Sequence, residues 1–386
     1  MQSTQQVNSH VSFMPAKREQ VSTRIIFFIA GFVTAAWAAI VPYVKLNTGA
    51  NDATLGMLLL CFGGGALIAM PVTGALAAKF GCRRLMVFST IAFSLLFPIL
   101  SSLSQINFII IALLLFGIFI GLTDCAMNVQ AVIVEKSSDK PIMSGFHGFY
   151  SVGGIAGAGT MSLILLLGVS ATMASIIVSV IAVVLLAICY NGLIPYANAP
   201  TGPLIAIPKG IVLVIGVVCF AVFLAEGAVL DWGAVFLIEH HGLEETLGGL
   251  GFAAFATTMT IGRLLGDKIV MRVGSSRVVF LGALLACLGF VIAVLSPHLI
   301  FAIMGFALVG AGSSNIVPVM FSAVGKQKTM PEALAVPAIS TLGYLGILAG
   351  PAAIGFVAFQ LSLATALLLI SALLVIIAFV TRFIRV

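Results

Sequence analysis

Two acidic residues, Glu226 and Asp231, interrupt a hydrophobic segment, residues 211–237, that is long enough to cross a lipid bilayer. A charged side chain at mid-membrane costs roughly 3 kcal/mol even on lenient insertion scales, so a carboxylate kept there is expected to have a function. Glu226 lies near the centre of the segment, whereas Asp231 lies nearer one interface, beside Trp232. Five residues apart on a helix, the two carboxylates point about 140° away from each other. We therefore predict that Glu226 carries chemistry, and we favour a structural role for Asp231.

A second embedded carboxylate, Asp124, lies near the middle of another hydrophobic segment, residues 106–135. Asn128 follows one helical turn later on the same face, and His147 is expected at a similar depth in the next segment. Because burial disfavours the charged form of a carboxylic acid, Asp124 and Glu226 are predicted to bind and release protons. The alternative is that each carboxylate only accepts hydrogen bonds from neighbouring helices. For His147, titration near physiological pH and a hydrogen bond at a helix end fit the sequence equally well.

Other polar and aromatic side chains are expected near mid-membrane. Trp37 and Asn315 fall there when depth is counted from the ends of their segments. Tyr150 and Tyr344 also lie well inside their segments, away from the headgroup level where aromatic belts occur. Sugars and flat organic molecules stack on such rings, although packing against other helices or lipid is the competing interpretation. The predicted substrate-binding residues are Trp37, Asn128, His147, Tyr150, Asn315 and Tyr344.

The composition indicates a polytopic membrane protein. The 386 residues are 61% hydrophobic and only 8% charged, which excludes a soluble globular protein. Apolar runs and their breakers predict an all-α membrane protein with twelve transmembrane helices. The first run is too long for a signal peptide, so we expect it to remain as a span. The predicted spans are 24–46, 53–78, 84–103, 106–135, 142–167, 171–190, 209–238, 246–271, 277–296, 298–323, 332–358 and 361–381.

Charged residues predict the orientation of the chain. Lys and Arg gather in the connectors after spans 2, 4, 8 and 10 and at the C-terminus, whereas the connector after span 7 is acidic. The positive-inside rule then predicts that both termini are cytoplasmic. An even number of spans agrees with this, because it places both termini on the same side of the membrane. Orientation explains the net charge of +6 better than nucleic-acid binding does.

The sequence also predicts two related halves. A segment with four prolines, residues 191–208, is typical of a linker. Lys79-Phe-Gly-Cys-Arg-Arg84 after span 2 matches Arg272-Val-Gly-Ser-Ser-Arg277 after span 8. The predicted organisation is a cytoplasmic tail (1–23), a six-helix bundle (24–190), a cytoplasmic linker (191–208) and a second six-helix bundle (209–386). Repeated halves with a site at their interface, near the bilayer midplane, are a known plan for transporters.

Residues 74–84, Gly-Ala-Leu-Ala-Ala-Lys-Phe-Gly-Cys-Arg-Arg, resemble the signature between spans 2 and 3 of the major facilitator superfamily. The resemblance implies two pseudo-symmetric halves with spans 1, 4, 7 and 10 around a central cavity. The chain has Ala78 where the family usually has an aspartate, and Glu135 is expected to replace that aspartate at the cytoplasmic gate. More narrowly, the segments 124–130, 147–154 and 226–232 resemble the bacterial YbjJ-like branch, which is often grouped with fucose permease.

The basic connectors are also expected to form a cytoplasmic gate. Arg263 and Asp267 are one turn apart and are predicted to form an ion pair at the inner end of span 8. Their predicted role is in switching between states and not in substrate recognition. The full predicted gate consists of Lys79, Arg83, Arg84, Glu135, Arg263, Asp267, Arg272 and Arg277.

The sequence offers no motif for a cofactor or metal. The six cysteines have no metal-binding spacing. The adjacent residues His240 and His241 point apart on a helix and are better explained as part of a solvated loop. No Walker A loop is present, so direct use of ATP is not expected.

We therefore predict a secondary active transporter that works by alternating access in the bacterial inner membrane. The preferred form is a proton-coupled symporter for a small polar, sugar-like solute, and the alternative is a proton-driven exporter of drugs or metabolites. A sensor or intramembrane enzyme is the competing class, but the protease and channel motifs are missing. The expected partners are lipid, a small-molecule substrate and protons, with no nucleic acid, and we expect a monomer.

Overall fold

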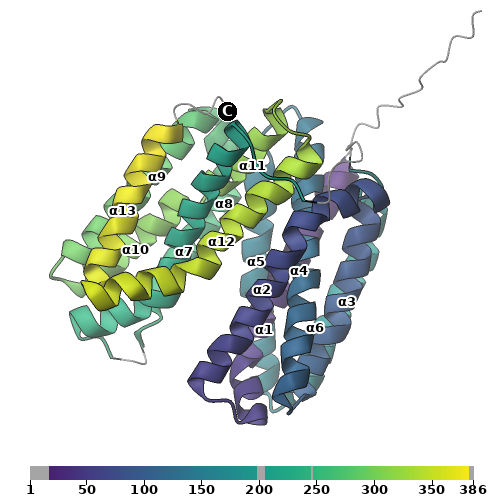
Figure 1. Cartoon of the computed structure of the whole chain (residues 1–386), viewed down its shortest axis with the longest axis horizontal. Helices are drawn as coiled ribbons and strands as arrows, with labels where there is room; N and C mark the ends of the chain where they lie inside the picture. Colours follow the sequence, from purple (N-terminus) through teal and green to yellow (C-terminus); the bar gives the residue numbers. More distant parts are fainter. Residues whose placement is uncertain (1–16, 198–204, 245–246, 382–386) are drawn as a thin grey trace, which may run out of the picture.

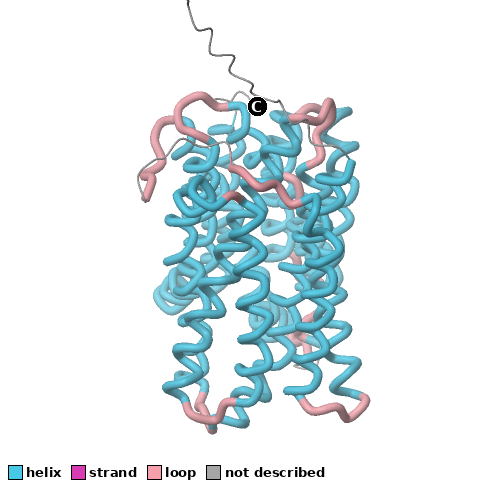
Figure 2. Tube along the Cα trace, turned by 90° about the vertical axis from the view of Figure 1, so that its right-hand side faces the viewer, coloured by secondary structure: helices cyan, strands magenta, loops and turns pink. Residues whose placement is uncertain are grey.

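The computed structural model describes residues 17–197, 205–244 and 247–381. Within these ranges the chain is helical, with loops gathered at two opposite ends of a bundle (Figures 1 and 2). The helices are α1 (Lys17–Thr48), α2 (Asp52–Phe80), α3 (Cys82–Ser102), α4 (Ile106–Lys136), α5 (Met143–Leu166), α6 (Ala171–Cys189), η1 (Tyr190–Gly192), α7 (Ile211–His241), α8 (Leu250–Val273), α9 (Ser275–Leu295), α10 (Leu299–Ser313), α11 (Ile316–Lys326), α12 (Glu332–Gln360) and α13 (Leu363–Val380).

The helices correspond to the twelve predicted spans, with α10 and α11 together forming the tenth. Within the described ranges, eleven segments are long and apolar enough to cross a membrane. The remaining predicted span corresponds to α8, which is not apolar enough because it contains Arg263, Asp267, Lys268 and Arg272. The predicted all-α fold is therefore confirmed. One boundary differs, because α1 begins at Lys17 and so extends into the segment predicted as a tail.

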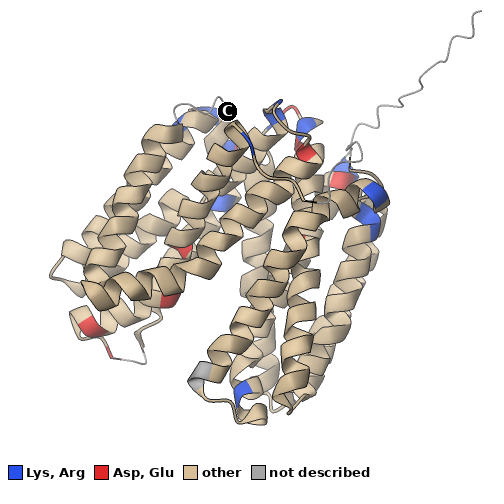
Figure 3. Ribbon diagram, viewed as in Figure 1, with Lys and Arg blue, Asp and Glu red and all other residues tan. Residues whose placement is uncertain are grey.

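Helices α1–α6 form one bundle and α7–α13 form the other. The two bundles meet mainly where α2 lies against α12 and α5 lies against α8. Figure 1 shows their ribbons close together at the end where the described chain starts and finishes, and diverging toward the other end. Most Lys and Arg residues lie at the end where the two bundles are close together (Figure 3). We call it the basic end and define it by the α2–α3, α4–α5, α8–α9 and α11–α12 connectors.

Glycines make the sharp turns in the repeated basic motif. Gly81 joins α2 to α3 with φ of 81°, and Gly274 joins α8 to α9 with φ of 87°. These left-handed backbone angles favour glycine over residues that carry a Cβ. The two glycines occupy matching positions in the repeat, so the internal sequence similarity corresponds to the same turn in each half.

Small residues on α5 allow close contact with α1. A Cβ on Gly153 or Gly157 would overlap the carbonyl oxygen of Phe28 or Phe32 on α1. Membrane helices use such residues because close backbone approach drives their association. In the same helix, a Cβ on Gly159 would meet no other atom within 4 Å.

We expect Gly157→Ala to destabilise the protein by about 1–3 kcal/mol, the usual cost of overpacking. Gly159→Ala should be neutral, because it adds the same methyl group to the same helix in open space. Thermal unfolding of both variants in detergent checks this prediction. Equal melting temperatures would contradict the assigned α1–α5 contact.

Candidate functional site

A cavity of about 190 Å³ lies between the two bundles. The first bundle contributes residues from α1, α2, α4 and α5, and the second contributes residues from α7, α8, α11 and α12. Six of the eight residues predicted to bind protons or substrate line it: Asp124, Asn128, His147, Tyr150, Glu226 and Tyr344. The structure thus brings together, in one cavity, residues that are up to about 220 positions apart in the sequence.

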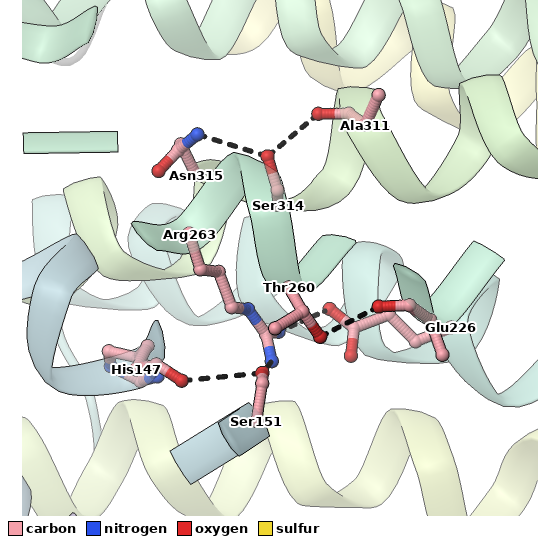
Figure 4. A network of polar contacts seen from close by, with 9 residues as sticks. His147, Ser151, Glu226, Thr260, Arg263, Ala311, Ser314 and Asn315 are labelled. Atoms are coloured by element: carbon pink, nitrogen blue, oxygen red, sulfur yellow. Dashed lines mark hydrogen bonds and ion pairs between the residues drawn. The ribbon is translucent and has the colours of Figure 1, made fainter. Parts of the chain in front are cut away.

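Glu226 is held by an ion pair with Arg263. The Arg263 guanidinium donates to Glu226 through Nη2, with 3.3 Å between Nη2 and Oε1 (Figure 4). Its Nη1 donates to the Ser151 hydroxyl on α5 at 3.1 Å. Both charged side chains are largely buried, with exposed fractions of 14% for Glu226 and 9% for Arg263. Arg263 therefore links α7 of its own bundle to α5 of the other.

This contact corrects one prediction about Arg263. The predicted ion pair with Asp267 is not formed, because the Arg263 side chain extends to Glu226 instead. Arg263 also lines the cavity and bonds Ser151 of the other bundle, so its predicted role in switching stays a prediction. The i,i+4 spacing allowed the Asp267 pair, but a buried carboxylate on the neighbouring helix is the stronger partner, since an unpaired buried charge is costly.

Asp124 differs from Glu226 in having no cationic partner. Among the residues that the structure describes, none donates a hydrogen bond to its carboxylate or forms an ion pair with it. The Asn128 amide donates through Nδ2 to the backbone oxygen of Asp124 at 2.9 Å. The Asn128 Oδ1 atom is buried and has no hydrogen-bond partner among the described residues. The alternative of a carboxylate tied by neighbouring helices thus does not describe Asp124.

His147 lies at the cavity wall between two aromatic rings. Its ring centroid is 5.3 Å from that of Phe27 and 5.5 Å from that of Phe321. The Nε2 atom is buried without a partner in the described part of the chain. Buried polar atoms are normally hydrogen-bonded, so this nitrogen is available to a ligand or to water.

Aromatic side chains line more of the cavity than predicted. Tyr150 and Tyr344 were expected, whereas Phe62, Phe223 and Phe321 were not. The chain has 28 phenylalanines, most of which are indistinguishable from lipid-facing or core residues by sequence. Only the rotation of each helix, which the sequence does not reveal, selects these three.

Two predicted substrate-binding residues do not line the cavity. Trp37 is 4% exposed and packs in the first bundle, with ring centroids 6.1 Å from Phe116 and 6.4 Å from Phe62. Asn315 lies at the break between α10 and α11, where its Nδ2 donates to the Gly262 oxygen at 3.0 Å. The same atom donates to Ser314 Oγ at 3.0 Å (Figure 4). Depth counted from the ends of a helix does not show which way a side chain faces. Because neither side chain faces the cavity, the proposed site does not include Trp37 or Asn315.

Two carboxylates cap the start of α5 at the basic end. Glu135, from α4, accepts the N–H groups of Ile142 and Met143 at 3.0 and 3.1 Å. Asp267, from the other bundle, accepts the Gly145 N–H at 3.0 Å. A helix N-terminus has unpaired N–H groups and a partial positive charge, so both carboxylates are well placed there. Glu135 therefore does not pair with the basic residues of the α2–α3 connector as predicted. Asp267 connects the two bundles, because it lies on α8 and accepts a hydrogen bond from the start of α5.

The remaining predicted gate residues make few contacts between the bundles. Arg83 stays within the first bundle and donates to the Leu193 oxygen at 2.6 Å and to the Asn191 oxygen at 3.2 Å. Lys79 lies over the ring of its neighbour Phe80. Arg84, Arg272 and Arg277 are exposed and have no hydrogen bond or ion pair to any described residue.

An ion pair that the sequence did not predict joins the bundles at the basic end. Lys136, the last residue of α4, pairs with Glu332, the first residue of α12. The Lys136 side chain is 48% exposed, so solvent screens this pair and limits its contribution. The charges were visible in the sequence, but the partners are 196 residues apart.

We expect Asp267→Asn to shift the protein toward states open at the basic end by about tenfold. The change removes a charge–helix interaction of up to about 2 kcal/mol. Lys136→Met should shift the population less, because an exposed ion pair contributes about 1 kcal/mol or less. Distances between spin labels at positions 139 and 328, which are exposed on opposite bundles, measure the shift. An unchanged distance distribution in Asp267→Asn would remove this contact from the gate.

Comparison with known proteins identifies the family. The model of the Major Facilitator Superfamily matches residues 25–328. An uncharacterized MFS-type transporter of Yersinia pestis is 48% identical over 94% of this chain and 95% of its own length. Membrane protein MosC of Rhizobium meliloti is 31% identical over 91% of this chain and 86% of its own length.

Solved structures show the same fold at low sequence identity. The fucose:proton symporter of E. coli matches with a TM-score of 0.76 at 15% identity, over 95% of this chain and 98% of that chain. The proton:xylose symporter XylE matches with a TM-score of 0.74 at 14% identity, over 96% of both chains. Together with the family model and the relatives, these matches show that the chain is a multi-pass membrane transporter that belongs to the major facilitator superfamily.

Proposed function

We propose that this transporter moves a small polar, sugar-like solute by alternating access and couples that movement to protons. The observation that carries the proposal is a single cavity lined by one carboxylate from each bundle, Asp124 from α4 and Glu226 from α7. Ionisable residues inside a membrane protein are typical of substrate and proton pathways. Two of the structural neighbours are themselves described as proton symporters for sugars.

The size of the cavity favours a small solute. The cavity has a volume of about 190 Å³. Drug-sized ligands usually occupy cavities of about 300–1,000 Å³. A molecule the size of a monosaccharide fits this space better than a large drug does.

The contacts between the bundles support alternating access. Lys136–Glu332 and Asp267–Gly145 both join the bundles at the basic end. The ribbons diverge toward the other end (Figure 1). By the positive-inside rule the basic end is cytoplasmic, so the structure corresponds to a conformation closed toward the cytoplasm. We place the protein in the bacterial inner membrane as a monomer with both termini cytoplasmic.

The proposed coupling works through the Glu226–Arg263 pair. A proton on Glu226 removes the negative charge that holds the Arg263 guanidinium. Arg263 also donates to Ser151 of the other bundle, so its release weakens a contact between the bundles. Protonation at the site is thereby connected to a change in how the bundles are held together.

Export of an apolar compound is the second candidate, favoured by the hydrophobic part of the lining (Phe62, Met70, Phe223, Phe321 and Ile347). A thermal-shift screen of purified protein against sugars, nucleosides, amino acids and common drugs identifies a ligand, because binding raises the apparent stability. Proteoliposomes with pH gradients of either sign then separate the candidates. A symporter accumulates solute on the alkaline side, whereas an antiporter accumulates it on the acidic side. Indifference to both gradients would overturn proton coupling.

A further inference from the structure

The cavity contains a carboxyl group, Asp124, that has no cationic partner among the described residues. Its titratable or charged lining residues are Asp124, His147, Tyr150, Glu226, Arg263 and Tyr344. Arg263 is paired with Glu226. No described residue donates a hydrogen bond to the Asp124 carboxylate or pairs with it. Because a lone charge inside a membrane protein is costly, Asp124 must either bind a proton or be paired with a positive group of a ligand.

The atoms beside Asp124 require hydrogen-bond donors. Asn128 lies one turn away, and its Nδ2 donor is already used by the Asp124 backbone oxygen. Its Oδ1 atom has no partner among the described residues, and an amide oxygen can only accept. An ionised carboxylate is likewise an acceptor only. A ligand at this wall must therefore bring N–H or O–H groups.

Aromatic rings surround the same space. Phe62, Tyr150, Phe223, Phe321 and Tyr344 all line the cavity. The faces of such rings attract cations, and the attraction is stronger where water is excluded. A lone carboxylate with aromatic walls is a typical environment for an ammonium group.

We propose that the substrate is a small amino polyol whose ammonium group binds Asp124. The ammonium takes the place of a proton on Asp124, and the hydroxyl groups of the ligand donate to Asn128 Oδ1. Glu226, which already has Arg263 as its cation, is left to carry the coupled proton. This assignment rests on the proposed function. It gives substrate binding to Asp124 and proton binding to Glu226.

Matched pairs of ligands test the charge requirement. Glucosamine is compared with glucose and N-acetylglucosamine, and glucamine is compared with sorbitol, by thermal shift and calorimetry on the purified full chain. Each amine should bind at least about tenfold more tightly than its neutral partner, because hydrogen bonds to charged groups are among the strongest in proteins. Asp124→Asn should abolish this preference. Asp231→Asn should keep it, because Asp231 is exposed and does not line the cavity.

Three results would overturn the assignment: equal binding of the amine and neutral partners, a preference that survives Asp124→Asn, or no binding of either amine. Comparison of ligands on the wild-type protein remains informative if Asp124→Asn does not fold. Failure here leaves the proposed function intact, because proton coupling through Glu226 is measured separately in proteoliposomes. If the amine preference is found but transport is not coupled to protons, proton coupling is rejected and the assignment of the ammonium group to Asp124 remains.

Discussion

Replacement of Arg263 by methionine is expected to destabilise the protein by about 3 kcal/mol or more. The change leaves Glu226 as a buried charge without its partner, and breaking a buried pair on one side typically costs about 3–5 kcal/mol. The double variant Arg263→Met/Glu226→Gln should recover most of that loss, because the remaining amide is neutral. Thermal unfolding of the wild type, both single variants and the double variant gives the complete cycle.

Arg272→Met is the matched control for this cycle. Arg272 lies on the same helix, is exposed and has no hydrogen bond or ion pair to any described residue. Surface substitutions of this kind usually change stability by no more than about 0.5 kcal/mol. If Arg263→Met behaves like Arg272→Met, or if the double variant is no more stable than Arg263→Met alone, the ion pair does not have the role assigned to it.

Glu226→Gln is expected to abolish accumulation of solute under a pH gradient while exchange of solute across the membrane continues. The glutamine keeps the shape of the side chain but cannot bind and release a proton. Accumulation should fall to the level of protein-free liposomes, whereas exchange of labelled for unlabelled solute needs no net proton movement. Both quantities are measured in the same proteoliposomes.

Asp231→Asn serves as the control, since Asp231 lies on the same helix but is exposed and outside the cavity. It should accumulate solute as the wild type does. Undiminished accumulation by Glu226→Gln would exclude Glu226 as a coupling residue. Loss of accumulation in both variants would show that α7 tolerates neither change and that the effect is not specific to the cavity.

Hydropathy and charge were sufficient to predict the spans, because each depends only on local sequence. They were not sufficient to predict which side chains meet. Glu226 and Asp124 were found because a carboxylate inside an apolar run is conspicuous wherever it points. Trp37 has a suitable depth, yet it packs against Phe116 inside the first bundle. Helix rotation separates these cases, and a nearly uniform hydrophobic sequence contains little information on rotation.

The sequence was also insufficient to predict which residues pair with each charged side chain. Arg263 is spaced to pair with Asp267, but it crosses to Glu226, and Asp267 instead caps α5 in the other bundle. Glu135 was expected to replace the aspartate that is absent at Ala78, but it accepts N–H groups at the start of α5. In each case the partner is a helix or a helix end that only tertiary packing brings within reach.

Proton coupling is tested by recording the external pH while wild-type proteoliposomes take up an identified solute with no gradient imposed. Coupled transport predicts that protons move with the solute in a fixed ratio, and that a protonophore dissipates the pH change without stopping solute entry. Solute uptake at an unchanged external pH would contradict proton coupling at the Asp124–Glu226 cavity.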